Sequence, residues 1–244
     1  MKIALEPQRL RNILSSAMIL KADPLIKEPI AEVKENGLVI KDRSLGVMQE
    51  YLIFSKNYFM EFDGSGVTNF VLTETMYDKL SWGFKGDKVT VSITEDKSKV
   101  VFEGEGENYS EPLVNKEVEE FKIEMASSDV GLLPKKMSPV LQVLIPTDSL
   151  RLPETEQYYL KASESDKRIV VSVMDIGKYT RELKFTRANI LKDLDIDIDG
   201  DFYQHILNNL TGEIWFSAVP EAVAFTQKTA DYSYTYLLSA KLRG

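Results

Sequence analysis

The sequence contains no cysteine and only one histidine among its 244 residues. The lack of cysteine excludes disulfide bonds and thiolate zinc sites, and it agrees with a reducing compartment. No apolar run approaches the ~18 residues that a membrane span needs, and Glu6, Arg9 and Arg11 stand where a signal peptide would be apolar. We therefore expect a cytoplasmic protein with no membrane partner.

A surplus of positive charge is also missing. The 38 acidic residues outnumber the 30 Lys and Arg, which gives a net charge of −8. This balance argues against a protein that coats nucleic acid with its whole surface, but it leaves room for a local basic face. The length and the 43% hydrophobic content allow one large domain or two of about 120 residues each.

Motifs for catalysis and for metal or nucleotide binding are scarce. No P-loop signature occurs, and residues 64–66 and 104–106 are Gly-x-Gly turns that lack the third glycine of a dinucleotide site. Residues 195–200 begin like a calcium loop, but Ile206 stands at the twelfth position, where a bidentate Glu is required. The Asp/Ile alternation there indicates a half-buried strand instead.

The sequence therefore predicts a protein that is not an enzyme and needs no cofactor or metal. A Ser-His-Asp arrangement would have to use His205, whose neighbours Ile206 and Leu207 indicate packing rather than catalysis. A carboxylate-based hydrolase stays open as an alternative, because 38 acidic residues guarantee some pairs, although no pair is singled out.

Most segments have the pattern of antiparallel strands with one buried face. They alternate or run apolar for four to seven residues between Gly, Asp, Asn and Ser clusters. The clearest cover residues 38–42, 50–55, 88–93, 99–105, 168–174 and 213–219. Helical spacing is rarer, and it predicts helices at residues 7–20, 74–84 and 200–210. The expected fold class is α+β, dominated by antiparallel sheet.

The two halves of the chain have similar sequence patterns. Residues 50–59 match residues 182–191, with Phe54 and Phe185 separated by 131 positions, and Leu80 and Leu210 fall 130 apart. At the front, residues 4–14 match residues 124–137, which predicts a strand end, a cap and a third helix there. We expect two similar domains, residues 1–114 and 121–244, joined by a short charged connector at residues 115–120.

Several fragments then resemble one known family. They are Ile40-Lys41-Asp42-Arg43-Ser44, Phe59-Met60-Glu61-Phe62-Asp63, Met125-Ala126-Ser127-Ser128-Asp129, Ala218-Val219-Pro220, and the ending Tyr236-Leu237-Leu238-Ser239-Ala240-Lys241. Their order and spacing resemble the sliding clamps of the proliferating cell nuclear antigen (PCNA) type, and the short connector suggests a divergent archaeal or viral member. The resemblance implies a two-domain clamp subunit with antiparallel sheets outside and short helices lining a ring, usually a homotrimer.

The resemblance also implies a function. Such a clamp encircles duplex DNA without sequence specificity and acts as a processivity factor that tethers the replicative DNA polymerase, after a clamp loader has opened the ring. The expected location is then the nucleoid or a host-cell replication site. A clamp-like transcription coactivator, or a relative that never encircles DNA, stays open as an alternative.

Site residues follow from the same resemblance. Basic residues on or beside the helices are the candidate DNA contacts: Arg9, Arg11, Lys79, Lys85, Lys135 and Lys136. The fourth helix carries no Lys or Arg, so its part of the lining would be neutral. The candidate partner-docking pocket comprises Leu45, Val47, Pro220, Tyr236, Leu238 and Ala240.

Overall fold

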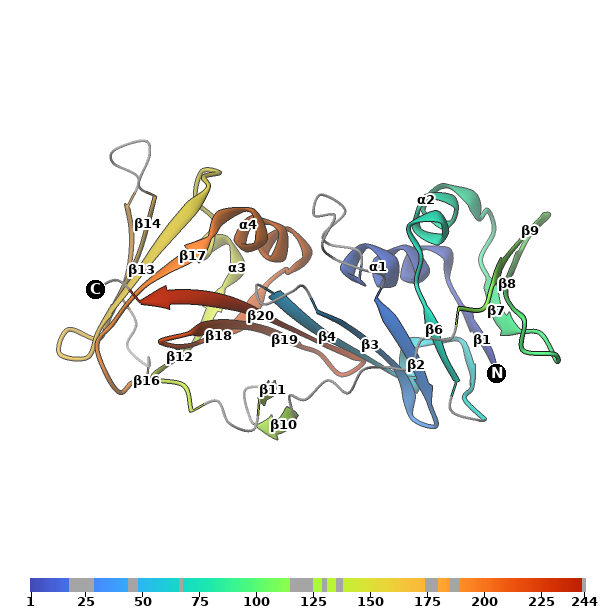
Figure 1. Cartoon of the computed structure of the whole chain (residues 1–244), viewed down its shortest axis with the longest axis horizontal. Helices are drawn as coiled ribbons and strands as arrows, with labels where there is room; N and C mark the ends of the chain where they lie inside the picture. The colour runs from blue at the N-terminus through green and yellow to red at the C-terminus, as the bar shows by residue number, and fades with distance from the viewer. Residues whose placement is uncertain are drawn as a thin grey trace. The chain divides into compact units, whose positions relative to one another are not determined.

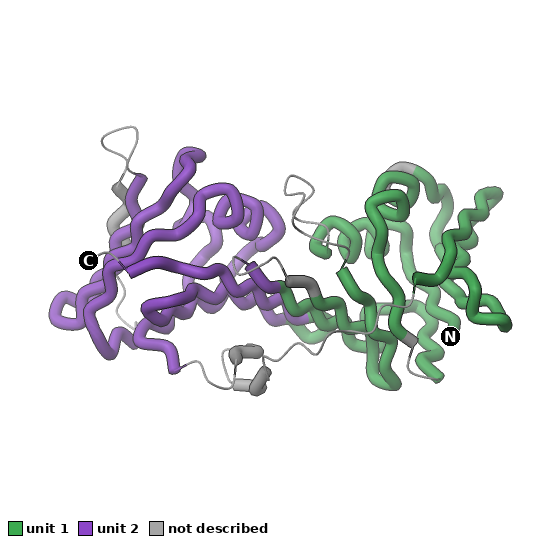
Figure 2. Tube along the Cα trace, in the orientation of Figure 1, with its two compact units in different colours: residues 1–44, 50–121, 229–232 green, residues 45–49, 122–228, 233–244 purple. Residues whose placement is uncertain are grey.

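The computed structural model (Figure 1) describes residues 1–17, 29–43, 48–65, 68–114, 125–128, 131–134, 138–173, 180–184 and 189–242. The chain divides into two compact units (Figure 2). Unit 1 comprises Met1–Ser44, Glu50–Phe121 and Thr229–Tyr232. Unit 2 comprises Leu45–Gln49, Lys122–Lys228 and Ser233–Gly244.

Unit 1 contains two groups of antiparallel strands. The first is a five-stranded sheet in the order β5-β1-β7-β8-β9, with bounds β1 (Lys2–Leu5), β5 (Glu61–Asp63), β7 (Val89–Ile93), β8 (Lys99–Gly104) and β9 (Glu107–Pro112). The second runs β6-β2-β3-β4, with bounds β2 (Ile30–Lys34), β3 (Gly37–Arg43), β4 (Met48–Ser55) and β6 (Thr68–Val71).

Two helices of unit 1, α1 (Pro7–Ala17) and α2 (Glu74–Gly83), lie beside each other, and a short 3-10 turn, η1 (Lys56–Tyr58), follows β4. The apolar stripe of α1, formed by Leu10, Ile13 and Leu14, is buried against both strand groups. Between them lies an apolar cavity of about 30 Å³. The strands and helices thus enclose one core.

Unit 2 contains a longer antiparallel run. Its described strands follow the order β15-β14-β13-β17-β20-β19-β18-β12-β16, with bounds β12 (Leu141–Pro146), β13 (Gln157–Ser163), β14 (Arg168–Val173), β15 (Thr180–Lys184), β16 (Asn189–Ile190), β17 (Leu194–Asp199), β18 (Glu213–Val219), β19 (Ala222–Lys228) and β20 (Tyr232–Leu242). A separate two-stranded hairpin pairs β10 (Met125–Ser128) with β11 (Gly131–Pro134).

The helices of unit 2, α3 (Thr147–Leu150) and α4 (Gly200–Asn209), cover one face of this run. Tyr203 of α4 packs against Phe225 of β19 with ring centroids 5.7 Å apart, and Phe225 lies 5.1 Å from Phe216 of β18. All three side chains are fully buried. Aromatic burial between α4 and the sheet therefore forms the centre of this core.

The predicted strands and three of the four predicted helices are confirmed. Residues 38–42, 50–55, 88–93, 99–105, 168–174 and 213–219 correspond to β3, β4, β7, β8, β14 and β18. The calcium-like segment is β17, as the Asp/Ile alternation indicated. Helices α1, α2 and α4 begin at the expected residues.

The prediction of a helix within residues 124–137 is wrong. Met125 pairs with Pro134 and Ser128 with Gly131, so the described residues 125–128 and 131–134 are two antiparallel strands. Gly131 and Pro134 are poor helix formers, which accounts for the difference. The helix of unit 2 that precedes α4 is α3, a single turn after β12. Lys135 and Lys136 lie outside the described residues.

Candidate functional site

Helix α1 presents two of the predicted DNA contacts, Arg9 and Arg11. The Arg9 side chain is 36% exposed, and its Nε lies 3.7 Å from a carboxylate oxygen of Glu6. Its guanidinium donates a hydrogen bond to the carbonyl of Tyr58 and stands 5.2 Å from the centroid of that ring. Arg11 is half-buried, and its Nε is enclosed without a hydrogen-bond partner among the described residues. Part of the positive charge of α1 is thus held against unit 1.

Tyr58 holds Arg9 in this position. Its hydroxyl donates a 3.4 Å hydrogen bond to the carbonyl of Arg9, and its ring meets Tyr232 edge-on at 6.1 Å. Burial raises the pKa of Tyr58 to about 12, an effect that the nearby Arg9 charge opposes. The phenol therefore stays neutral at physiological pH and serves as a fixed apolar and hydrogen-bonding support for the guanidinium.

Helix α2 carries Lys79 on an exposed face that it shares with Glu74 and Asp78. Thr73 caps the helix by accepting a 3.1 Å hydrogen bond from the amide of Met76. The Lys79 ammonium lies 4.6 Å from the ring centroid of Tyr109 on β9. This contact fixes the cation above the edge of the five-stranded sheet. Lys85 is exposed just beyond the end of the helix.

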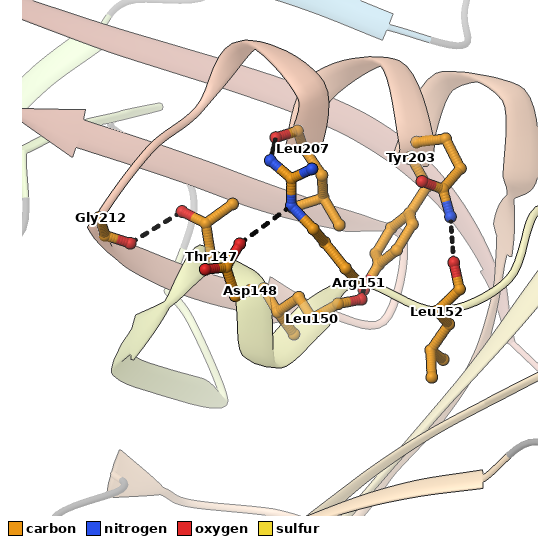
Figure 3. Close-up of polar contacts among 9 residues, drawn as sticks. Thr147, Asp148, Leu150, Arg151, Leu152, Tyr203, Leu207 and Gly212 are labelled. Atoms are coloured by element: carbon orange, nitrogen blue, oxygen red, sulfur yellow. Dashed lines mark hydrogen bonds and ion pairs between the residues drawn. The ribbon is translucent and has the colours of Figure 1, made fainter.

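Helices α3 and α4 are joined by polar contacts to the main chain (Figure 3). The Thr147 hydroxyl donates to the carbonyl of Gly212 at 2.9 Å, and the Tyr203 hydroxyl donates to the carbonyl of Leu150 at 2.8 Å. Gln204 donates to the carbonyl of Leu152 at 2.8 Å. These bonds tie both ends of α3 to α4 and to the turn after it.

Arg151 is a basic residue beside α3 and α4 that the sequence analysis did not identify. It follows α3 and donates a 3.1 Å hydrogen bond to the carbonyl of Leu207 in the last turn of α4 (Figure 3). Its Nε also lies 3.2 Å from Asp148. A cation at a helix C-terminus is favourable because it meets the negative end of the helix dipole. The four-residue length of α3 left too little periodicity to reveal this position.

The charges on the described helices nearly cancel. The four helices contain three basic residues, Arg9, Arg11 and Lys79. They contain four acidic residues, Glu74, Asp78, Asp148 and Asp201. When Lys85 and Arg151, which lie just beyond α2 and α3, are added to these residues, their net formal charge is +1. The helices of the described part of the chain therefore carry no net excess of basic residues.

The predicted partner residues separate into two groups. Tyr236 and Leu238 of β20 are fully buried, opposite Phe225 and Val223 in the sheet register. They are core side chains of unit 2. By contrast, Pro220, at the turn between β18 and β19, and Ala240, on β20, are half-buried. The amide of Ala240 donates a 2.8 Å hydrogen bond to the carbonyl of Glu221 in that turn. Leu45 and Val47 lie outside the described residues.

The opposite face of the same strands carries a further apolar group. Trp215 packs against Ala224 and Leu237, and Leu144, which is 42% exposed, is the register partner of Trp215. Partly exposed aromatic and aliphatic side chains that adjoin in this way are typical of protein contact surfaces. Sequence reasoning missed this group, although the alternation in residues 213–219 was the signal that could have indicated it.

Metal-binding clusters and membrane-spanning helices are both absent from the described residues. These residues contain no group of three or more His, Asp or Glu placed to hold a metal ion. In the same ranges, no helix has both the length and the apolar character that crossing a membrane requires.

Comparison with known proteins identifies the fold. No family model and no curated protein sequence matches the chain. Among solved structures, the crystal structure of proliferating cellular nuclear antigen from Entamoeba histolytica is similar to it with a TM-score of 0.76 and 10% sequence identity. The match covers 99% of this chain and 98% of that chain. The chain therefore has the two-domain clamp fold, made mostly of antiparallel sheet with few short helices.

Proposed function

We propose that the chain is one subunit of a ring-shaped sliding clamp that encircles duplex DNA. The observation that carries the proposal is the match of the clamp fold over nearly the whole length of both chains. Two domains, residues 1–114 and 121–244 with a connector at 115–120, would form the subunit, and three copies would close the ring. Such a protein performs no chemistry and needs no cofactor.

The proposed DNA contacts are Arg9, Arg11, Lys79 and Lys85, together with Lys135 and Lys136. Each would meet a phosphate without reading bases, which suits a ring that slides. Because Glu74 and Asp78 accompany Lys79 on α2, and α4 carries Asp201 but no Lys or Arg, we expect weak contact per subunit. Retention on DNA would then depend on closure of the ring more than on affinity.

The proposed partners are a replicative polymerase and a clamp loader, at the nucleoid or a host replication site. Pro220 and Ala240, with Leu45 and Val47, are the proposed docking positions. Tyr236 and Leu238 would support them from the core, since both are fully buried. Trp215 and Leu144 extend the proposal to a second face of the same strands.

Two measurements test this function. Light scattering after gel filtration, across a concentration series, should give three times the chain mass of 27.7 kDa. The ring is then closed around circular nicked DNA by cross-linking. The cross-linked protein should stay on the circular DNA and should slide off after that DNA is linearised. Equal loss from both DNA forms would contradict encirclement.

One observation favours a second candidate, a clamp relative that does not encircle DNA and serves, for example, transcription. The charges on the described helices nearly cancel, so the surface has little of the basic excess that binds phosphate. A persistent monomer with no salt-sensitive DNA association would favour this candidate over the ring.

A further inference from the structure

The helical side of unit 2 carries an excess of exposed acid. It comprises α3, the loop at residues 151–156 that joins α3 to β13, and α4. It contains one base and four acids, which gives a formal net charge of −3 with histidine neutral. The base is Arg151, and the acids, all of them exposed, are Asp148, Glu154, Glu156 and Asp201. Phosphate groups that approach this side of unit 2 therefore meet charge of their own sign.

Hydrogen bonds hold the loop after α3 against α4. Gln204 of α4 donates 2.8 Å to the carbonyl of Leu152, and the Tyr158 hydroxyl donates 2.7 Å to another carbonyl of the loop. Burial raises the pKa of Tyr158, and the charges of Glu154 and Asp201 add to the rise. Both carboxylates thus act on the same phenol. The acids of the loop and of α4 therefore belong to one surface with a fixed arrangement.

The single base of this side does not offset those acids. The Nε of Arg151 lies 3.2 Å from a carboxylate oxygen of Asp148, and its guanidinium donates a 3.1 Å hydrogen bond to the carbonyl of Leu207. The positive charge is thereby paired with Asp148 and with the negative end of α4. The exposed carboxylates of the loop and of the first turn of α4 keep their negative charge toward solvent.

The helices of unit 1 have the opposite balance. Residues 7–17 and 74–85 contain four bases and two acids, which gives a formal net charge of +2. The bases are Arg9, Arg11, Lys79 and Lys85, and the acids are Glu74 and Asp78. Both lysines are exposed, and both arginines are partly exposed. The helical sides of the two units therefore carry charge of opposite sign.

We infer that the helices of unit 1 hold duplex DNA, while the acids of unit 2 keep the duplex away from α3 and α4. The inference rests on the proposed clamp, and it assigns the helical contact with DNA to one half of each subunit. Repulsion between exposed charges reaches about 8 Å at physiological ionic strength, so the acids act on a phosphate before α4 can touch it. In a ring of three subunits, attracting surfaces would alternate with repelling ones, and the duplex would slide without being held from all sides.

Salt concentration should reveal this repulsion. At low salt the acids of unit 2 oppose the attraction between DNA and the bases of unit 1, and at high salt both effects are screened. Neutral side chains in place of the acids should therefore strengthen DNA association at low salt and change it little at high salt. The plot of log K against log salt should become steeper.

A triple variant tests the acids directly, with Glu154→Gln, Glu156→Gln and Asp201→Asn. Each change keeps the size of the side chain and removes its charge. Fluorescence anisotropy on duplex DNA should show association at least about threefold tighter than that of the wild type at low salt, and equal association at high salt. Asp148 stays unchanged, because its loss would release Arg151 for contact with DNA.

The matched control removes three exposed acids from turns of unit 2, with Glu164→Gln, Asp166→Asn and Glu221→Gln. The turns that hold them lie at the far ends of β13 and β18, each seven residues long, from the loop after α3 and from α4. The control changes the net charge of the chain by the same amount and should bind DNA like the wild type. Circular dichroism and a melting curve on both triple variants verify folding.

Cross-linking measures which helix lies near the DNA. The chain contains no cysteine, so a single Cys can carry a benzophenone probe at one chosen position. Ser15 on α1 and Asn208 on α4 are both exposed and both lie in the last turn of their helices. On duplex DNA, the probe at Ser15→Cys should give at least about threefold more cross-link than the probe at Asn208→Cys. In the triple variant that lacks the acids, the yield from position 208 should rise.

The outcomes separate the inference from the proposed function. Wild-type protein that neither associates with duplex DNA nor stays on circular DNA would overturn both. Wild-type protein that stays on circular DNA, with equal cross-linking from the two positions or with unchanged association in the triple variant, would overturn the inference and leave the clamp intact. Tighter association of the triple variant but not of its control, together with the stronger cross-link at α1, would establish the inference.

Discussion

The guanidinium of Arg9 lies 5.2 Å from the centroid of the Tyr58 ring and donates a hydrogen bond to the Tyr58 carbonyl. Arg9 thus has a structural task in addition to any contact with DNA. The planar guanidinium of arginine can stack on a ring and donate hydrogen bonds at the same time, which the ammonium of lysine cannot do. The two roles can therefore be separated by substitutions that keep or remove the charge.

Replacement of Arg9 by Lys should keep its charge and lose the stacked, hydrogen-bonded geometry. We expect a loss of about 1 kcal/mol in the free energy of unfolding, since the interaction combines a partly exposed cation–π pair with one hydrogen bond. The salt dependence of DNA association should stay unchanged. Urea unfolding and DNA titrations at several salt concentrations measure the two effects. A stability equal to that of the wild type would show that the Tyr58 interaction contributes little.

Replacement of Arg11, Lys79 and Lys85 by Ala should weaken DNA association without unfolding the chain. For each phosphate that a side chain no longer neutralises, the steepness of log K against log salt should fall by about 0.9. Fluorescence anisotropy on duplex DNA measures this slope, and Lys228→Ala, at an exposed position of β19, is the control. An unchanged slope would remove these residues from the DNA-facing set.

The sequence predicted the strands and most helices because their periodicity is long enough to read. β4 alternates over eight residues, and α1 repeats Leu10, Ile13, Leu14 and Ala17 at helical spacing. The repeat was less well predicted. Thr73 caps α2 through the amide of Met76, and Asp199 caps α4 through the amide of Phe202, so Met76 and Phe202 are equivalent positions. These two residues are 126 positions apart. The expected offset of 130, taken from Leu80 and Leu210, therefore differs from the offset of the caps by about one helical turn.

The candidate site was harder to predict than the fold. Strands β18, β19 and β20 bury side chains on both faces, so alternation could not tell which face Tyr236 and Leu238 occupy. Likewise, Arg9 and Arg151 donate hydrogen bonds to carbonyls that lie 49 and 56 residues further along the chain. Local patterns carry no information on such contacts.

The cavity in unit 1 predicts a stabilising substitution. Its volume of about 30 Å³ is lined by apolar side chains that include Val91, and one added methylene should fit. We expect Val91→Ile to raise the free energy of unfolding by about 0.8 kcal/mol. Val89→Ile, at a buried position of the same strand outside the cavity, should lower it by about 1 kcal/mol or more through overpacking. Thermal unfolding of both variants distinguishes filling from crowding.

The hydrogen bond from Arg151 to α4 predicts a second effect on stability. Arg151→Ala removes the 3.1 Å bond to the Leu207 carbonyl and the cation at the helix C-terminus. The expected cost is about 1 kcal/mol. Asp148 is 91% exposed, so Asp148→Asn should change stability by less than about 0.5 kcal/mol. Equal losses in the two variants would mean that the ion pair, and not the hydrogen bond to the helix, holds Arg151.

His205 should make the stability of the protein depend on pH. Burial in α4 lowers its pKa below the ordinary value, an effect that the charge of Asp201 only partly offsets. The unfolded chain therefore binds a proton at a higher pH than the folded chain does, and stability should fall as the pH drops from the unfolded pKa through the folded one. Because the chain contains a single histidine, His205→Gln should remove this dependence in the range below the ordinary histidine pKa of about 6.5. Urea unfolding of both proteins across that range measures it, and an equally steep decline in the variant would assign the effect to carboxylates instead.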